Sequence, residues 1–407
     1  MFCMAFVVAS SQTAVKQEMD SMMQIWQHRA DSIAKIKRVI FFNKLENFPI
    51  DTIGTINING LHLKELPNIN RFCNIIAIDA ERNKLKKVSA RQIKIDSLTR
   101  LNLSNNNLKR INFPRNSVIE SLNLSNNKLL RIPYSIRKLK HLKSLIISKN
   151  QIKRIPRFLK KMEQLNSLEI NFNKIKPSKA DIRRLKNIEV LLLAGNNIAS
   201  LPININDLEN IKKLNLSKNK LSSVPPKFAL LDSLETIVFY KNEFTQIPLE
   251  ITMLPNLKII DFYYNNISEI PDEIGNIKNL SIVFLAYNKI EIIPDTIRSL
   301  KNIKALYIHD NKLFNIPNWI TELSSLEVLD ISYNNLFSIP DMSNMPKLYE
   351  VDIQENEITY FPWKLMEKPE LKLLFIRGNP FILDKEERQQ LKITLEEKRA
   401  VGVVIVD

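Results

Sequence analysis

A pattern of 23 residues recurs through most of this chain and constrains its fold more than any other feature. The pattern reads L-x-x-L-x-L-x-x-N-x-L-x-x-[IL]-P, and it is clearest in residues 142–156, 188–202 and 280–294. Asparagine occupies the ninth position at 83, 106, 127, 150, 173, 196, 219, 242, 265, 288, 311, 334, 356 and 379. From Asn127 to Asn334 every step is 23 residues. A constant period of this length indicates a solenoid in which each repeat forms one coil.

The pattern also predicts the structure of each coil. Apolar residues at alternate positions indicate a short strand with one buried face. One coil cannot bury that face alone, so neighbouring coils must stack and share a core. The asparagine suits a turn, because its amide can satisfy backbone groups that a buried bend leaves unpaired. The segment after Ile-Pro then returns along the outer side as a short helical stretch, and the wedge-shaped coils curve around a parallel sheet.

These residues make the chain similar to the leucine-rich-repeat family, in particular to the 23-residue Ile-Pro type of bacterial surface proteins and of eukaryotic Ras-regulating scaffolds. The resemblance covers residues 53–383 in about 15 repeats. It departs locally, with Leu61 in the asparagine slot and Ser178 in place of an apolar residue. It implies an α/β solenoid: a curved horseshoe with a parallel β-sheet on the concave face, short helical or 3-10 segments on the convex face, and a cap at each end.

The segments that flank the repeats are expected to act as these caps. Residues 12–52 predict a helical cap and a degenerate half repeat, and the cap's apolar residues at helical spacing are Met19, Met22, Met23, Trp26 and Ile33. In residues 384–407, Asp384 is expected to N-cap a helix that runs to about Arg399. The tail at 401–406 reads as a strand that either covers the last coil or offers an edge to a partner.

Residues 1–11 resemble the end of a secretory signal peptide, because an apolar stretch ends in the small residues Ala9 and Ser11. A basic residue before the apolar stretch is missing. The segment favours a secreted or cell-surface protein, and a cytoplasmic location is the alternative. No later segment has the length to span a bilayer.

The usual signatures of cofactor and metal sites are missing from the sequence. None of the six glycines stands in a phosphate-binding motif, and the two cysteines, Cys3 and Cys73, cannot build a zinc site or a disulfide framework. His309 and Ser332 share the seventh slot of adjacent coils, near Asp310 and Asp330, but neither an oriented third group nor an oxyanion hole can be identified. We therefore expect no cofactor, no metal and no enzymatic activity.

The repeat template identifies the residues of the concave surface, since its third, fifth, seventh and eighth slots project from that face. Between residues 98 and 126 these slots carry mostly small polar residues. Further along, they hold six of the nine tyrosines of the chain, although they are only four positions in each 23. The candidate protein-binding residues are Tyr240, Asp261, Tyr263, Tyr264, Phe284, Tyr287, Tyr307, His309, Asp310, Asp330, Tyr333, Asp352, Phe375 and Arg377.

Two interpretations of this aromatic and acidic group remain open. Exposed tyrosines on a rigid sheet have the properties of a protein-binding hot spot, since they supply a large contact area at a small cost in entropy. Alternatively, the rings stack across adjacent strands and stiffen the sheet. If the group binds, its acidic residues favour a basic or neutral protein surface.

A basic segment forms a second candidate surface. Residues 82–187 contain 28 Lys and Arg against 5 Asp and Glu, a net charge of +23 in a chain whose total is +16. Cations that follow the asparagine slot in consecutive coils should stack along one edge: Lys109, Arg110, Lys128, Arg131, Lys153, Arg154, Lys174 and Lys176. Such a stripe attracts polyanions such as sulfated glycans or an anionic surface, or it only keeps the protein soluble. Sequence-specific nucleic-acid binding is not expected, because no groove-reading helix or base-stacking platform is present.

Three hypotheses about function follow from these predictions. The first is a secreted or surface bacterial protein that binds a protein ligand through the concave face, with an adhesion or host-contact role implied by the resemblance. The second is a polyanion binder that uses the basic half. The third is an intracellular signalling scaffold similar to the Ras-regulating repeat proteins.

Overall fold

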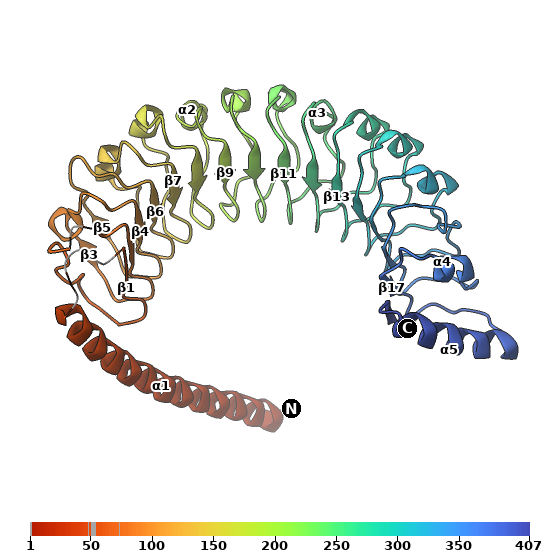
Figure 1. Ribbon diagram of the computed structural model, residues 1–407, viewed down its shortest axis with the longest axis horizontal. Coiled ribbons are helices and arrows are strands. Elements are labelled where there is room, and N and C mark those ends of the chain that lie inside the picture. Colours follow the sequence, from red (N-terminus) through yellow and green to blue (C-terminus); the bar gives the residue numbers. More distant parts are fainter. Residues whose placement is uncertain (1, 48, 50–53, 73) are drawn as a thin grey trace. The chain divides into compact units, whose positions relative to one another are not determined.

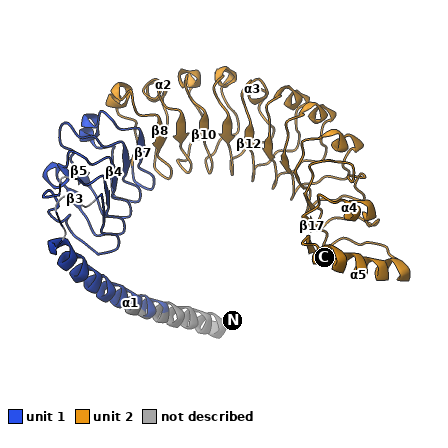
Figure 2. Ribbon diagram, in the orientation of Figure 1, with its two compact units in different colours: residues 1–151 blue, residues 152–407 orange. Residues whose placement is uncertain are grey.

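The computed structural model describes residues 2–47, 49, 54–72 and 74–407, and for residues 2–18, 21 and 25 it describes the backbone only. Cys73 therefore lies outside the described residues, as do residues 50–53 at the predicted start of the repeats and the side chain of Cys3. The chain divides into two compact units, residues 1–151 and residues 152–407 (Figure 2).

Unit 1 consists of a long helix followed by short strands (Figure 1). Its helix is α1 (Phe2–Asn47), and the 3-10 helices η1 (Ala90–Ile93) and η2 (Tyr134–Lys138) lie among the repeats. Its main parallel sheet contains β1 (Thr55–Asn57), β2 (Ala77–Asp79), β4 (Arg100–Asn102), β6 (Ser121–Asn123) and β7 (Ser144–Ile146). A second parallel pair is formed by β3 (Lys87–Val88) and β5 (Arg110–Ile111).

Most coils of unit 2 contain one strand and one short helical segment. The parallel strands are β8 (Ser167–Glu169), β9 (Val190–Leu192), β10 (Lys213–Asn215), β11 (Thr236–Val238), β12 (Ile259–Asp261), β13 (Ile282–Phe284), β14 (Ala305–Tyr307), β15 (Val328–Asp330), β16 (Glu350–Asp352), β17 (Leu373–Phe375) and β18 (Val404–Val406). The helical segments are α2 (Lys179–Arg183), η4 (Ile205–Asp207), η5 (Pro226–Leu230), α3 (Leu249–Thr252), η6 (Asp272–Asn276), η7 (Asp295–Ser299), η8 (Asn318–Glu322), α4 (Trp363–Glu367) and α5 (Lys385–Ala400), with η3 (Arg157–Lys161) at the start. Within this unit the strands line the inner, concave side and the helical segments lie on the outer side (Figure 2).

The register between coils follows the sequence repeat. Leu214 pairs with Ile237, and Ile237 pairs with Ile260, so that equivalent residues of successive coils lie side by side. The central residue of each strand is buried, whereas the residues on either side of it are for the most part only partly buried. This alternation places the apolar side chains in a continuous core and the third and fifth slots on the concave surface. The predicted leucine-rich-repeat solenoid is confirmed.

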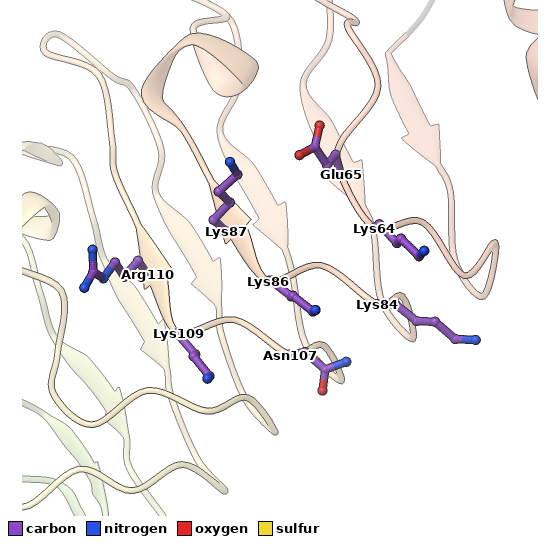
Figure 3. Close-up of a pocket in the computed structure, with 8 residues that line it drawn as sticks. All are labelled: Lys64, Glu65, Lys84, Lys86, Lys87, Asn107, Lys109 and Arg110. Carbon is purple, nitrogen blue, oxygen red and sulfur yellow. The ribbon is translucent and has the colours of Figure 1, made fainter.

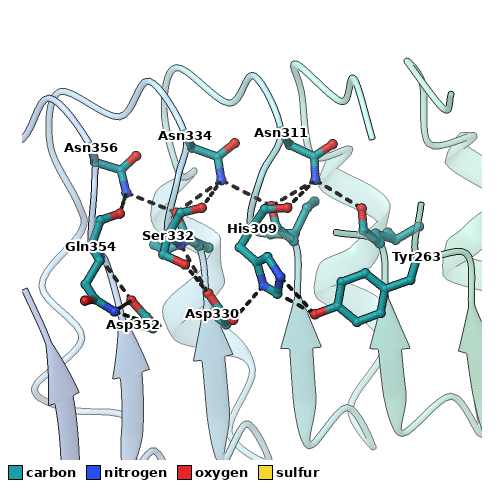
Figure 4. Close-up of polar contacts among 12 residues, drawn as sticks. Tyr263, His309, Asn311, Asp330, Ser332, Asn334, Asp352, Gln354 and Asn356 are labelled. Carbon is teal, nitrogen blue, oxygen red and sulfur yellow. Dashed lines mark hydrogen bonds and ion pairs between the residues drawn. The ribbon is translucent and has the colours of Figure 1, made fainter. Parts of the chain in front are cut away.

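The asparagines of the ninth slot form a buried ladder that joins successive coils. Asn311 is representative: its Nδ2 donates to the carbonyls of Leu285, Ile308 and His309, each at 3.0 Å. Its Oδ1 accepts from the backbone N–H of Ile290 at 2.9 Å. Asn334 and Asn356 make the equivalent bonds (Figure 4). One amide therefore satisfies four backbone groups, two of them in the preceding coil, as the turn argument predicted.

The N-terminal segment differs from the predicted cap. A helix is present, but the five apolar residues expected to close the first coil are all more than half exposed: Met19, Met22, Met23, Trp26 and Ile33. The described contacts of α1 with the repeats come instead from its second half, where Asp31 lies 2.8 Å from Lys84 Nζ and 2.5 Å from His62 Nδ1. These ion pairs hold the pKa of Asp31 at about 2. The buried apolar residues of α1 are Ala34 and Leu45 among the described side chains, so the helix uses a different apolar set from the predicted one and adds an ionic contact.

The C-terminal segment agrees with its prediction. Asp384 caps α5 by accepting a hydrogen bond from the N–H of Glu387 at 2.8 Å, and the helix ends at Ala400. Strand β18 pairs in parallel with β17, and its Ile405 is buried. Of the two alternatives for the tail, the structure therefore supports the strand that covers the last coil.

Ser178 also has a structural explanation. It interrupts the apolar pattern because it is the N-cap of α2: its backbone N–H and hydroxyl both donate to the carboxylate of Asp181. The hydroxyl in turn accepts from the N–H of Asp181 at 3.3 Å. This reciprocal capping box starts an α-helical turn where most other coils have a 3-10 turn.

Candidate functional site

The candidate site lies on the concave face of unit 2, across strands β11 to β17. Strand register aligns the fifth-slot residues into one row across the sheet: Val238, Asp261, Phe284, Tyr307, Asp330, Asp352 and Phe375. Seventh- and eighth-slot residues continue the same surface at the end of each strand. We call this surface the concave patch, and it consists of the fourteen protein-binding candidates of the sequence analysis.

The rings of the concave patch stack across adjacent coils. The centroids of Phe284 and Tyr307 are 4.9 Å apart with nearly parallel rings, and Tyr263 stacks on the other side of Phe284 at 5.8 Å. Tyr264 and Tyr287 are closer still, at 4.0 Å and 6° between their planes. This arrangement contributes to the rigidity of the sheet, as the second interpretation proposed.

Stacking nevertheless leaves part of the aromatic surface open to solvent. Tyr264 is 43% exposed, Tyr287 is 38% exposed and Tyr333 is 51% exposed. None of the ring contacts in the described part of the chain involves Tyr333. The rings therefore stiffen one another while still offering area to a ligand, so the two interpretations are compatible.

His309 lies in a hydrogen-bonded chain between two coils (Figure 4). Its Nδ1 is 2.6 Å from the Asp330 carboxylate, and its Nε2 is 3.0 Å from the Tyr263 hydroxyl. The Ser332 hydroxyl donates to Asp330 at 2.7 Å, and Ser332 is almost fully buried. Ser332 is therefore bonded to the acid and not to the imidazole. The order serine–aspartate–histidine–tyrosine differs from that of a nucleophilic triad, in which the imidazole contacts the serine.

The eighth slot has a left-handed backbone in each of these coils. Tyr264 and Tyr287 have φ of 54°, and Tyr333 and Asp310 have φ of 50°. Asparagine and glycine adopt this region at the least cost and occupy the slot at 105, 126, 195 and 378, whereas other coils hold Lys149, Lys218 or Lys241 there. An aromatic residue in this conformation costs roughly 1 kcal/mol more than glycine. Three coils of the concave patch bear that cost.

The fifth slot of the concave patch also holds residues that the fold does not require. Asn102, Asn123 and Asn215 each accept a hydrogen bond at Oδ1 from the backbone N–H two residues later. Three acids of the concave patch, Asp261, Asp330 and Asp352, make the same turn with a carboxylate. The turn therefore needs only an amide, and the negative charge is not required by the fold.

Two of these carboxylates are costly to ionise. Burial raises the pKa of Asp261 to about 6 against the hydrogen bond from Tyr263, and burial likewise raises the pKa of Asp352 to about 6. Among the described residues, neither acid forms an ion pair with a cation. A raised pKa means that the folded state holds the proton more tightly than the unfolded state. Folding stability from these groups is therefore present at low pH and falls as the pH rises through about 6.

The remaining candidates extend the concave patch at its two ends. Tyr240 contacts Tyr264 edge-on at 5.6 Å, while Phe375 is partly buried and Arg377 is exposed. Burial raises the pKa of Asp310 and of Glu350, an acid that the sequence analysis did not select. Phe172 was not among the predicted residues, although it occupies an eighth slot and is 42% exposed. The slot itself would have predicted this exposure, because an aromatic residue at the eighth slot is exposed wherever it occurs in the described part of unit 2.

The eight cations of the predicted basic stripe are all exposed. Four belong to unit 1 (Lys109, Arg110, Lys128 and Arg131) and four belong to unit 2 (Lys153, Arg154, Lys174 and Lys176). In the described chain, none of them forms an ion pair with an acidic residue. Their charges are therefore available to a ligand.

Among the described residues, no group of three or more His, Cys, Asp or Glu side chains is arranged to hold a metal ion. Among the helices they form, none combines the length and the apolar character of a segment that crosses a bilayer.

Comparison with protein-family models gives matches over several parts of the repeats. A model described as leucine-rich repeat region matches residues 249–368, and one described as leucine rich repeat matches residues 117–175. A third model, also described as leucine rich repeat, matches residues 97–116 and 210–231. The sequence has no match among curated proteins.

Solved structures with the same architecture come from several sources. A leucine-rich-repeat protein of Leptospira interrogans is 25% identical, with a TM-score of 0.73, and the match covers 90% of this chain and 98% of that protein. An internalin of Listeria monocytogenes is 22% identical with a TM-score of 0.59, over 71% of this chain and 80% of the internalin. TLR13, solved in complex with ssRNA13, is 19% identical with a TM-score of 0.59, over 78% of this chain and 51% of TLR13. The last two similarities concern the fold alone.

Proposed function

Since this chain is a leucine-rich-repeat protein, a class of scaffold that typically serves protein interaction, we propose that it binds a protein ligand through the concave patch of unit 2. The ligand presents a basic or neutral surface, because carboxylates surround the exposed rings. The chain acts by binding and carries out no reaction. We further propose a secreted or cell-surface bacterial protein with a role in adhesion or host contact.

One observation carries the proposal. In the coils of the concave patch, two slots hold residues that the fold does not need and that reduce its stability. The left-handed eighth slot, which holds lysine in several other coils, holds the exposed rings of Tyr264, Tyr287 and Tyr333, where asparagine or glycine would cost less. The fifth slot holds Asp261 and Asp352 where asparagine would make the same turn without a buried charge. Residues that oppose stability at adjacent positions on one surface are typical of a binding site.

The partner can be identified by affinity capture at physiological salt with the wild type and with a Tyr264→Asn/Tyr287→Asn/Tyr333→Asn variant. Proteins captured by the wild type and lost in the variant are the expected concave-face ligands. If both forms capture the same proteins with equal yield, recognition does not use the exposed rings and the proposal fails.

Binding of a basic partner is expected to weaken as the pH falls from 7.5 to 5. At pH 7.5 Asp261 and Asp352 are ionised and can pair with the partner's cations, whereas at pH 5 most of both carboxyls hold a proton that binding must displace. We expect the affinity to fall about tenfold over this range, measured by titration calorimetry.

The isosteric Asp261→Asn/Asp352→Asn variant provides the control, since it keeps the turn and removes both charges. Its affinity at pH 7.5 should equal that of the wild type at pH 5, and its own pH dependence should be much weaker. A wild-type affinity that is constant or higher at pH 5 would rule out charge pairing at these two residues.

The location proposal has its own test, which is sequencing of the N-terminus of the protein purified from its source. Export with cleavage after Ser11 predicts a mature chain that starts at residue 12. An intact N-terminus on protein recovered from the cytoplasm would favour the signalling scaffold instead.

A further inference from the structure

A second surface of the molecule has the features of a binding site, and it lies in unit 1 (Figure 3). Three successive coils form a pocket of about 580 Å³ there. Six cations line it: Lys64, Lys84, Lys86, Lys87, Lys109 and Arg110. We call it the cationic pocket. Only its last two members belong to the basic stripe that the sequence analysis selected.

The backbone holds these cations in columns. Lys87 on β3 is the register partner of Arg110 on β5, and the Lys109 N–H donates to the Lys86 carbonyl at 3.1 Å. Equivalent side chains of adjacent coils therefore lie side by side, with backbones separated by about 4.8 Å. The columns give the pocket a linear array of positive charge that runs from coil to coil.

Few acidic groups offset this charge. Lys84 is paired with Asp31 of α1, and Glu65 is the acidic residue of the pocket lining. The other five cations form no ion pair with any acidic residue that the structure describes in unit 1. Like charges held at this spacing repel one another, so an anion that enters the pocket relieves repulsion as well as gaining attraction.

The shape and lining indicate the class of ligand. None of the lining residues is aromatic, so the pocket offers no platform on which a nucleobase could stack. Its charges line a recess and not a plane, which suits a flexible chain better than the flat surface of a bilayer. We propose that the cationic pocket binds a sulfated polysaccharide that lies across the three coils. This proposal is independent of the concave patch, which lies in the other unit.

The test is titration of the full chain with a size-defined heparin oligosaccharide at several salt concentrations. In the Lys86→Ala/Lys109→Ala variant we expect the affinity to fall about tenfold near physiological salt, and the slope of log affinity against log salt to decrease by about two. The matched control, Lys160→Ala/Lys161→Ala, removes two exposed lysines of η3 in unit 2 and should retain most of the affinity.

A gain-of-function variant distinguishes heparin binding in the cationic pocket from a general effect of net charge on heparin affinity. Asp31→Asn removes the partner of Lys84 and leaves that ammonium free, so it should tighten heparin binding severalfold. The proposal is overturned if both double variants lose affinity equally, if desulfated heparin binds as tightly as heparin, or if Asp31→Asn has no effect. Tighter, Lys86/Lys109-dependent binding of an RNA oligonucleotide or of phosphatidylserine vesicles would also overturn it.

Discussion

The Asn311→Ala variant is expected to lose about 3 kcal/mol of unfolding free energy, the largest stability effect of a single substitution that we predict. Asn311 is buried, and its amide bonds four backbone groups of its own and the preceding coil. Alanine leaves the Ile290 N–H without a partner in the core, at a cost of about 1–3 kcal/mol. It also removes one of the two hydrogen bonds that each of the three carbonyls accepts, since these keep the bonds from Asn288, Asn334 and the Tyr287 N–H. Urea unfolding followed by circular dichroism measures the loss.

The neighbouring Asn335 is the natural control for this substitution. It is exposed, and its backbone N–H bonds the Leu313 carbonyl, a contact that alanine retains. Asn335→Ala should therefore change the unfolding free energy by less than about 0.5 kcal/mol. If Asn311→Ala costs no more than Asn335→Ala, the asparagine ladder does not hold the coils together.

The Tyr264→Asn/Tyr287→Asn/Tyr333→Asn variant is expected to lose at least about 100-fold in affinity for the protein ligand. The three rings are the exposed aromatic members of the concave patch, and asparagine tolerates the left-handed backbone at all three positions. The variant removes the stack between Tyr264 and Tyr287 and their contacts with Tyr240, Tyr263 and His309. Relief of backbone strain offsets part of this loss, so unfolding stability should fall by no more than about 2 kcal/mol while binding is lost.

The single variant Tyr333→Asn separates the effect on binding from the effect on stability most clearly. Tyr333 has no ring partner among the described residues, so the single variant should gain about 0.5 kcal/mol in stability and lose affinity. Tyr360→Asn is the matched control, because Tyr360 is 80% exposed and lies outside the concave patch. A stability loss of several kcal/mol in the triple variant would instead make the rings structural.

Much of the fold could be predicted because the repeat encodes it directly. Alternation of apolar residues determined which strand residues are buried, and the constant period determined the register. The asparagine ladder followed from the turn chemistry of one residue type. Leu61 is the exception, and it occupies the terminal coil of the described repeats. An asparagine there would have no preceding coil whose carbonyl it could bond.

The contacts between side chains could not be predicted in the same way. His309 was paired with Ser332 because the two share a slot in adjacent coils, but His309 bonds Tyr263 two coils away. Such a contact depends on the length of the tyrosine side chain and not on strand spacing. Similarly, Asp31 binds Lys84 across 53 positions of sequence, outside any repeat. The apolar residues of the N-terminal helix showed its helical spacing but not which face contacts the coils.

Photo-crosslinking from the concave patch tests the central claim most directly. A photoreactive amino acid placed at position 287 should capture the ligand, because Tyr287 is exposed at the centre of the stacked rings. The same amino acid at position 360 should not. Capture at 287 but not at 360 is the result that we predict. Capture at 360 with none at 287 would show that the ligand binds elsewhere, and the concave patch would then be a structural feature of the sheet.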